Sequence, residues 1–414
     1  MKNSPSSVPN EMSARASWGL MLAAAAILMI TMGARLTTGL FISPINTATG
    51  LGIVSISFAL AIGQFVWGAA QPIFGVVADK YGSVAVIIIG ALLLATGLAL
   101  TPFVSTQAGL LLTMGILSAA GAGAGSFSIL IGAAAQTLPA HRRPFAAGFI
   151  NAGGSFGQFV FAPLMQAIIN SAGWVVAMLT MAVTTLLTIP LAFPLRRRPA
   201  TAIAASTTAA AEIGLGQQVR IALRDRSYWC LHAGFFTCGF HIAFLVTHLP
   251  GEVALCSLSA SVSATALALI GLFNIVGSLT AGALGARMRM KYLLLGMYAS
   301  RAVIIAVYLA APKTAWTFYI FAAALGLTWL ATVPPTAGLV GKLFGTRYLA
   351  TLFGLTLLSH QIGGFFGAWL GGLAIANFGN YNWMWYADIV LALAAALINL
   401  PIREAPVVRV AAAG

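Results

Sequence analysis

The chain has 414 residues, of which 60% are hydrophobic and only 7% are charged, whereas about 25% of the residues of a typical soluble domain are charged. Its formal net charge at pH 7 is +14. This composition excludes an ordinary soluble domain and indicates a protein that crosses a membrane several times. The positions of the basic residues along the chain then decide whether the positive charge indicates binding to a polyanion.

Long apolar runs recur along the chain, and each is close to the 20 or so residues that a helix needs to cross about 30 Å of hydrocarbon. The alternation of about ten residues that is typical of transmembrane strands is absent. We therefore predict an all-α membrane protein. Its twelve transmembrane helices are expected, in chain order, at 18–44, 51–78, 84–104, 107–136, 144–170, 173–194, 228–250, 259–285, 292–311, 315–341, 349–376 and 382–402.

The first apolar run follows the basic residues Lys2 and Arg15, as the core of a signal peptide does. It is longer than such a core, and no convincing cleavage site follows it. We therefore expect it to remain in the protein as the first transmembrane helix.

The basic residues gather on one side of the predicted membrane. With the N-terminus inside, the tails and even-numbered loops hold 18 of the 21, and only Lys313 falls in an outer loop. This asymmetry matches the positive-inside rule, so both termini are expected in the cytoplasm, at the inner membrane of a cell, with no nucleic-acid partner. The inner residues are Lys2, Arg15, Lys80, Arg142, Arg143, Arg196, Arg197, Arg198, Arg220, Arg224, Arg226, Arg287, Arg289, Lys291, Lys342, Arg347, Arg403 and Arg409.

The sequence carries no recognisable catalytic or metal-binding pattern. Paired carboxylates, a nucleophile triad, a nucleotide-binding loop and a metal-ligand cluster are all missing. The three cysteines, Cys230, Cys238 and Cys256, are odd in number and match no zinc spacing, so we interpret them as packing residues. We expect neither an enzyme nor a cofactor or metal, and an ion gradient or substrate exchange must supply the energy for any transport.

A change of composition divides the twelve predicted helices into six and six. The segment is basic and rich in Ala and Thr, and its part from 212 to 226 predicts an amphipathic helix on the inner leaflet. The expected organisation is a cytoplasmic tail at 1–17, a six-helix bundle at 18–195, a cytoplasmic linker at 196–227, a second six-helix bundle at 228–403 and a cytoplasmic tail at 404–414.

The two halves look like copies of one unit. The motif "LFISPI" ending the first span aligns with "LVTHLP" ending the seventh at an offset of 206 residues, which also aligns Gly157 with Gly363. An offset of 207 aligns Gly75 with Gly282. Parallel six-helix repeats place the substrate at their interface near the middle of the bilayer.

The segment "GVVADKYG" (75–82) resembles the cytoplasmic loop signature of the major facilitator superfamily. In that signature a glycine starts the turn, an acid caps a helix and a base follows, so the resemblance implies conformational roles for Asp79 and Lys80. In the second copy, "GALGARMRMK", Ala286 stands at the position of the acid. The resemblance covers nearly the whole chain and implies that spans one and seven face each other across a central cavity.

Two further motifs, "CGFHIAFLVTHLP" (238–250) and "SHQIGGFFGAWLGG" (359–372), resemble a bacterial branch of monocarboxylate-transporter-like members. The substrates of that group include small organic anions. Its better-studied members have a charged pair in span eight, where this chain has only Asn274 and Ser278 as polar candidates.

Arg35 is the main candidate for binding a substrate. A charge within the membrane costs at least about 2.5 kcal/mol and usually faces the bundle interior or an aqueous cavity. The repeat offset pairs Arg35 with His241, and a fixed cation facing a titratable one suits an anionic substrate. The alternatives are that Arg35 is a structural clamp held by backbone carbonyls, and that His241 is a satisfied core histidine.

Further polar or aromatic residues at mid-depth complete the predicted substrate site, and each is a weak candidate alone. They are Asn151, Gln158, Asn274, Trp329, His360 and Gln361. Pro334 and Pro335 interrupt span ten and predict a kink with a gating role, or a purely structural one. Arg301 and Asp388 lie in spans that the resemblance puts at the periphery, where we expect structural pairing or interface anchoring.

The sequence therefore predicts a secondary active transporter that moves a small, monocarboxylate-like organic anion across the cytoplasmic membrane by alternating access. The alternative is an exporter or importer of a larger amphipathic or aromatic metabolite, drug or vitamin, for which Phe244, Trp329 and Trp369 would suit. A remote alternative is a transport-inactive receptor or scaffold. The expected partners are an anionic small molecule, a proton or other coupling ion and the lipid bilayer, with the chain acting as a monomer.

Overall fold

The structure is a computed structural model, and it describes residues 14–196 and 213–407. The predicted tails, linker and amphipathic segment therefore lie partly outside the described residues. The first half contains α1 (Ala14–Leu36), η1 (Thr38–Phe41), α2 (Ile42–Thr49), α3 (Ile53–Tyr81), α4 (Ser83–Leu100), η2 (Thr101–Phe103), α5 (Gln107–Leu110), η3 (Leu111–Ser118), α6 (Ala119–Ala124), α7 (Phe127–Thr137), η4 (Ala140–Arg142), α8 (Arg143–Ala172), α9 (Trp174–Leu186), α10 (Thr188–Ala192) and η5 (Phe193–Leu195).

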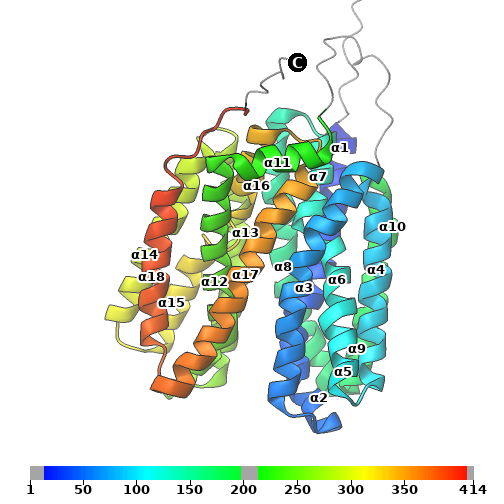
Figure 1. Cartoon of the computed structure of the whole chain (residues 1–414). Helices are drawn as coiled ribbons and strands as arrows, with labels where there is room; N and C mark the ends of the chain where they lie inside the picture. The colour runs from blue at the N-terminus through cyan, green and yellow to red at the C-terminus, as the bar shows by residue number, and fades with distance from the viewer. Residues whose placement is uncertain (1–13, 197–212, 408–414) are drawn as a thin grey trace, which may run out of the picture.

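The second half begins with a short helix that lies across one end of the molecule (Figure 1). This helix, α11, corresponds to the predicted amphipathic segment. The elements of the second half are α11 (Leu215–Arg224), α12 (Arg226–Leu255), α13 (Ala260–Gly285), α14 (Met290–Ala310), α15 (Ala315–Gly326), α16 (Val333–Phe344), α17 (Leu349–Phe378) and α18 (Asn382–Ile398).

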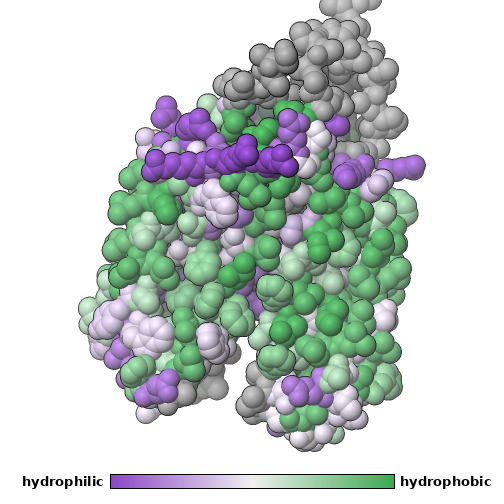
Figure 2. Space-filling view, viewed as in Figure 1, coloured by the Kyte–Doolittle hydropathy of each residue, from purple (hydrophilic) through white to green (hydrophobic). Residues whose placement is uncertain are grey.

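The predicted all-α membrane architecture is confirmed. Ten helices in the described ranges are long and apolar enough to cross a membrane, and two shorter apolar helices, Ala315–Gly326 and Asn382–Ile398, lie in spans ten and twelve. Apolar side chains cover the middle of the visible surface, while hydrophilic ones gather toward the two ends (Figure 2). Strands are absent from the parts of the chain that the structure describes.

Span one ends earlier than the sequence predicts. Its helix α1 stops at Leu36, and the chain turns through η1 into α2. The hydroxyl of Thr37 donates to the backbone carbonyls of Gly33 and Ala34. The hydroxyl of Thr38 donates to the backbone carbonyl of Arg35. Such local bonds compete with the helical ladder. Arg35 therefore lies in the last turn of α1, where the helix dipole favours a cation.

Span ten is broken, as its two prolines predict. Helix α15 ends at Gly326 and α16 begins at Val333, with a turn between them. Pro334 and Pro335 have no N–H to offer to the carbonyls four residues earlier. The carbonyls of Leu330 and Ala331 therefore lack their usual helical donors.

The two halves touch at one end and separate at the other. We call the end where α11 lies the linker end, and the end where α2 lies the far end (Figure 1). The halves meet mainly where α3 packs on α17 and α8 packs on α13. A cleft between them opens at the far end (Figure 2). The fold therefore joins two rigid bundles along two helix pairs.

The two crossings between the halves repeat each other in detail. A Cβ placed on Gly75 of α3 would lie 2.7 Å from the carbonyl oxygen of Ala350 in α17. A Cβ on Gly282 of α13 would lie 2.8 Å from the carbonyl oxygen of Pro144 in α8. Both distances are too short for a real side chain, so the predicted correspondence of the two glycines is also a correspondence of contacts. We call these the two glycine crossings.

Inside each half, another matched pair of glycines lets two helices approach. A Cβ on Gly157 of α8 would clash with the carbonyl oxygen of Met29 in α1, and one on Gly363 of α17 would clash with that of Phe236 in α12. Small residues at helix contacts are a common packing device in membranes.

Replacing Gly157 or Gly363 by Val is expected to destabilise the fold by about 1–3 kcal/mol, because overpacking of a tight helix contact costs that much. The measurement is the melting temperature and the monodisperse fraction of detergent-purified protein. Gly296→Val is the matched control, since no atom lies within 4 Å of a Cβ at this position of α14. Equal stability of all three variants would contradict the packing role.

Candidate functional site

A buried polar network joins the two halves where α8 crosses α13. The side-chain amide of Asn151 donates to the hydroxyl of Ser278 at 2.7 Å and to the carbonyl of Leu330 at 2.8 Å. The amide of Asn274 donates to the hydroxyl of Ser155 at 2.5 Å, and its oxygen accepts the N–H of Leu330 at 2.9 Å. All four side chains are buried. The predicted candidates Asn151 and Asn274 thus lie in one network, which we call the polar crossing.

The break in span ten supplies the backbone groups of this network. Leu330 lies in the segment 327–332. Its N–H donates to Asn274, and its carbonyl accepts from Asn151 as well as from the N–H of Val333. The neighbouring carbonyls of Thr328 and Trp329 accept hydrogen bonds from the guanidinium of Arg301 in α14. The double-proline motif therefore connects the interior of the second half with the interface between the halves.

Arg35 points into its own half, toward α3. Its guanidinium lies over the ring of Trp67, 4.5 Å from the ring centroid. The side chain is partly exposed, and no described carboxylate or hydrogen-bond acceptor meets the guanidinium. A small pocket beside it has about 20 Å³ of space for the centre of a water-sized sphere, which suffices for a single water molecule. Within the part of the chain that the structure describes, Arg35 is thus a cation without a neutralising partner.

The second half approaches this cation through α17. A Cβ on Gly68, the neighbour of Trp67, would lie 2.6 Å from the Cβ of Gln361. The amide of Gln361 contacts Nδ1 of His360 at 3.0 Å, and His360 also interacts with Cys238 of α12. Gln361 therefore lies at the contact between α3 and α17, whereas the pocket beside Arg35 is lined by residues of the first half alone.

His241 lies elsewhere, inside the second half. Its Nδ1 forms a hydrogen-bonded ion pair with a carboxylate oxygen of Asp388 in α18, and the two side chains are 1% and 0% exposed. The structure thus shows no contact between His241 and Arg35. Arg301 and Asp388, for which structural pairing or interface anchoring is expected, are both buried.

The other predicted candidates lie between these places. Trp329 is buried in the second half, with its ring 5.8 Å from that of His241 in an edge-to-face arrangement. Gln158 of α8 is partly exposed, and its carboxamide is 3.9 Å from a Cβ placed on Gly271 of α13. Gln158 is therefore next to the interface between the halves.

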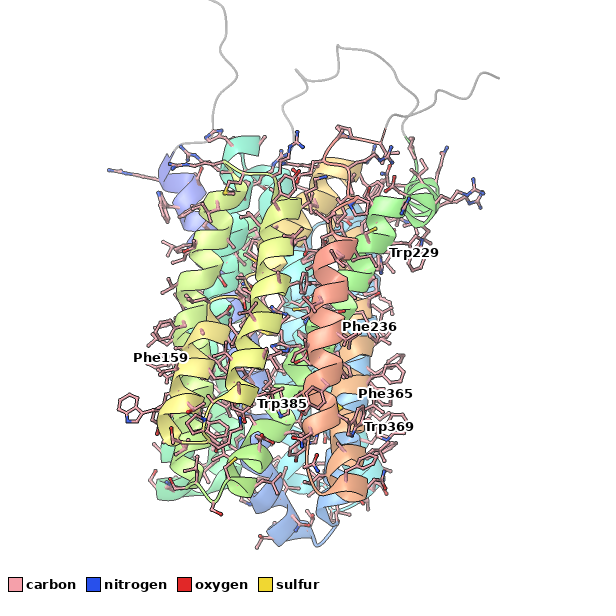
Figure 3. All side chains as sticks on the ribbon, turned by 90° about the vertical axis from the view of Figure 1, so that its left-hand side faces the viewer. Phe159, Trp229, Phe236, Phe365, Trp369 and Trp385 are labelled. Carbon is pink, nitrogen blue, oxygen red and sulfur yellow. The ribbon has the colours of Figure 1, made fainter. Side chains whose placement is uncertain are left out.

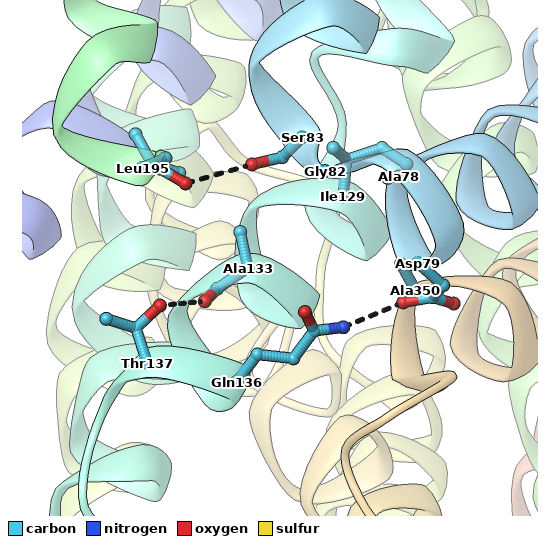
Figure 4. Close-up of a pocket in the computed structure, with 10 residues that line it drawn as sticks. All are labelled: Ala78, Asp79, Gly82, Ser83, Ile129, Ala133, Gln136, Thr137, Leu195 and Ala350. Atoms are coloured by element: carbon cyan, nitrogen blue, oxygen red, sulfur yellow. Dashed lines mark hydrogen bonds between the residues drawn. The ribbon is translucent and has the colours of Figure 1, made fainter. Parts of the chain in front are cut away.

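Asp79 holds the two halves together at the linker end. Its carboxylate accepts the N–H and the hydroxyl of Thr351 in α17, each at 2.7 Å, and the amide of Gln136 at 2.9 Å. The amide of Gln136 also donates to the carbonyl of Arg347. Figure 4 shows Asp79 and Gln136 around a small pocket that Ala350 of the second half also lines. Lys80 is exposed beside it.

Several residues of these sites were not found from the sequence. The ring of Trp67 packs against the guanidinium of Arg35, and the hydroxyl of Thr351 donates to the carboxylate of Asp79. Gln71 of α3 accepts the hydroxyl of Ser126 at 2.9 Å, and its amide nitrogen is buried without a partner. A polar residue within an apolar span is the signal that would have found Gln71, whereas Trp67 and Thr351 are ordinary residues in membrane helices.

Comparisons with known proteins agree with this architecture. A family model described as the Major Facilitator Superfamily matches residues 23–368. Monocarboxylate transporter 13 of Rattus norvegicus is 27% identical over 401 residues, which cover 93% of this chain and 89% of that protein. The oxalate:formate antiporter of Oxalobacter formigenes is 23% identical over 374 residues, which cover 87% of this chain and 86% of that protein.

A solved structure is similar over almost the full length. It is the proton:xylose symporter XylE bound to 6-bromo-6-deoxy-D-glucose, with a TM-score of 0.77 and 14% identity over 95% of this chain and 97% of that chain. At this identity the similarity shows the fold alone. The matched family model, however, spans most of the chain, and it describes transporters and not enzymes. The protein is a multi-pass secondary transporter that belongs to the Major Facilitator Superfamily.

Proposed function

We propose that the protein moves a small organic anion across the cytoplasmic membrane by alternating access, driven by an ion gradient or by exchange. The observation that carries this proposal is Arg35, whose guanidinium meets no carboxylate among residues 14–196 and 213–407. A buried cation costs free energy unless an anion or hydrogen bonds compensate it. A bound carboxylate would supply both, because guanidinium binds carboxylate through two parallel hydrogen bonds.

The names of two relatives support the anion class. One is a monocarboxylate transporter and the other an oxalate:formate antiporter, and both align with most of this chain. The alternative substrate, a larger aromatic compound, has less support. Phe244 and Trp329 are both buried in the core of the second half, and only Trp369, which lies beside Phe365 on α17 (Figure 3), is exposed.

We infer that the linker end faces the cytoplasm, since the basic residues that the positive-inside rule assigns to the inside cluster there. The cleft at the far end would then open outward, and the structure would represent the outward-open state. Asp79, Lys80 and the break at Pro334 and Pro335 are the proposed conformational elements. The protein is proposed to act as a monomer, since each chain contains both halves.

The experiment that tests the proposal is uptake of radiolabelled lactate, formate and oxalate into vesicles that contain the purified protein. Xylose serves as the neutral control. Uptake of at least one anion above protein-free vesicles, with no uptake of xylose, is the expected result. Uptake of none of the three anions would contradict the anion class.

Arg35→Gln is expected to weaken anion binding about 10- to 100-fold, because a hydrogen bond to a charged group contributes about 1.5–3 kcal/mol. Arg35→Lys is expected to lose less, since it keeps the charge but not the bidentate geometry. The measurement is the KM for uptake of the transported anion. The control is Arg287→Gln, which removes an equal charge from an exposed position. The site assignment fails if Arg35→Gln and Arg287→Gln have the same KM.

Asp79→Asn is expected to weaken the closure of the linker end and to favour closure of the far end. The carboxylate accepts three hydrogen bonds, and loss of about 2–3 kcal/mol changes the ratio of the two states about 30- to 160-fold. Electron–electron resonance between spin labels at Ala48 and Ala254, which are exposed in α2 and near the end of α12, measures the width of the far end.

Shorter distances between the two labels are expected in Asp79→Asn than in the unsubstituted chain. Lys80→Gln, at an exposed neighbouring position, tests whether the loop charge alone has this effect. An unchanged distance distribution in Asp79→Asn would show that these hydrogen bonds do not hold the linker end closed.

A further inference from the structure

A buried acid and a buried histidine share one hydrogen bond in the second half. Nδ1 of His241 in α12 meets Oδ2 of Asp388 in α18, and neither side chain is more than 1% exposed. The other two polar atoms of the pair, Nε2 of His241 and Oδ1 of Asp388, are buried and have no hydrogen-bond partner. Such atoms are costly in a purely structural pair, because an unpartnered buried polar group loses its hydration without compensation.

The charged neighbour of the pair is already committed to other partners. Arg301 of α14 donates to the carbonyls of Thr328 and Trp329 and contacts Sγ of Cys238 at 3.4 Å. It is near enough to Asp388 for their charges to interact. It makes no direct ion pair with Asp388 among the described residues. The acid therefore has one direct ionisable partner, the imidazole of His241.

The remaining titratable groups around this pair come from the helices packed against it. They are Cys238 from α12, Tyr298 from α14 and His360 from α17. None of these three side chains carries a permanent charge. Arg301 and the ionised Asp388 balance each other, so a proton taken up by the imidazole of His241 changes the net charge of the cluster by one.

We propose that the His241–Asp388 pair is the proton-binding site through which the transporter couples substrate movement to a proton gradient. In the proton-free state Asp388 is ionised and His241 is neutral, with its proton on Nδ1 in the bond to Oδ2. One proton then binds to Nε2 and gives an imidazolium beside the carboxylate, with no other group changing charge. This inference rests on the proposed transport function and names its coupling ion.

The pair is linked to the interface between the halves through Trp329. The ring of Trp329 lies edge-to-face against the ring of His241, and its carbonyl accepts a hydrogen bond from Arg301. The next residue, Leu330, bonds to Asn151 and Asn274 in the polar crossing. A change of charge on His241 therefore acts on the same broken segment that holds the two halves together.

The repeat divides the two electrostatic roles between the halves. At corresponding positions the first half has Arg35, whose charge is fixed, and the second half has His241, an imidazole that can bind or release a proton. The first would hold the anion and the second would hold the proton. A monocarboxylate taken up together with one proton crosses the membrane as a neutral pair.

The protonation state of His241 is measured directly by NMR of purified protein labelled with ¹⁵N-histidine. His241→Gln assigns the resonance. The expected result is that Nε2 of His241 changes from unprotonated to protonated between pH 9 and pH 5, and that Asp388→Asn moves the midpoint by at least one pH unit. A His241 resonance that stays in one state across this range, or is insensitive to Asp388→Asn, would overturn the proposal.

Transport in vesicles tests the coupling with lactate, formate and oxalate as probes. For the anion that the unsubstituted chain carries, Asp388→Asn should abolish accumulation driven by a pH gradient while retaining exchange of labelled for unlabelled anion, which needs no net proton movement. Asp388→Glu should restore part of the accumulation. His232→Gln is the control, because His232 is a buried histidine of the same helix that bonds to Ser359 instead.

The two proposals fail in different ways. Accumulation by Asp388→Asn equal to that of the unsubstituted chain would overturn the proton site. So would an unsubstituted chain that exchanges the anion but never accumulates it under a pH gradient, and in that case the proposed anion transport would stand. Failure to carry any of the three anions would overturn the proposed substrate class, and the NMR titration would then decide the proton site independently.

Discussion

Span ten is broken by Pro334 and Pro335, and the satisfaction of its freed backbone groups is the constraint on which much of the second half depends. In a membrane an unpaired carbonyl or N–H has no water to bond with, so the protein must supply partners. Arg301 supplies them from within the second half, and Asn151 and Asn274 supply them at the interface. The same six-residue segment therefore fixes a buried cation in place and joins the two halves.

The distribution of charge follows from that arrangement. Arg301 is occupied by carbonyls, and Asp388 pairs with the imidazole of His241. In the first half, Arg35 stacks on Trp67 and keeps its charge without a protein counterion. Each half thus holds one group that lacks a permanent opposite charge. A transporter that carries an anion together with a cation needs two binding sites, one for the anion and one for the cation.

The sequence predicts the twelve spans, the duplicated halves and the break in span ten, because hydropathy, the repeat offset and proline chemistry are properties of the chain itself. It does not predict which way each side chain points. Lipid and protein interior are both apolar, so a membrane helix such as α17 has no polar face that would orient it. Arg35 was therefore paired with His241 by sequence offset, whereas the packing of α12 against α18 turns His241 toward Asp388.

The two glycine crossings restrict how this molecule can leak. Gly75 against Ala350 and Gly282 against Pro144 are equivalent backbone contacts on opposite sides of the interface between the halves. Because each half is a stiff bundle, tilting that opens one crossing must open the other in the same movement. A passage that opens along one side only is thereby suppressed. The two halves are expected to separate at both crossings when they close at the other end. Such a seal keeps small ions from running down their own gradients while a larger solute is carried.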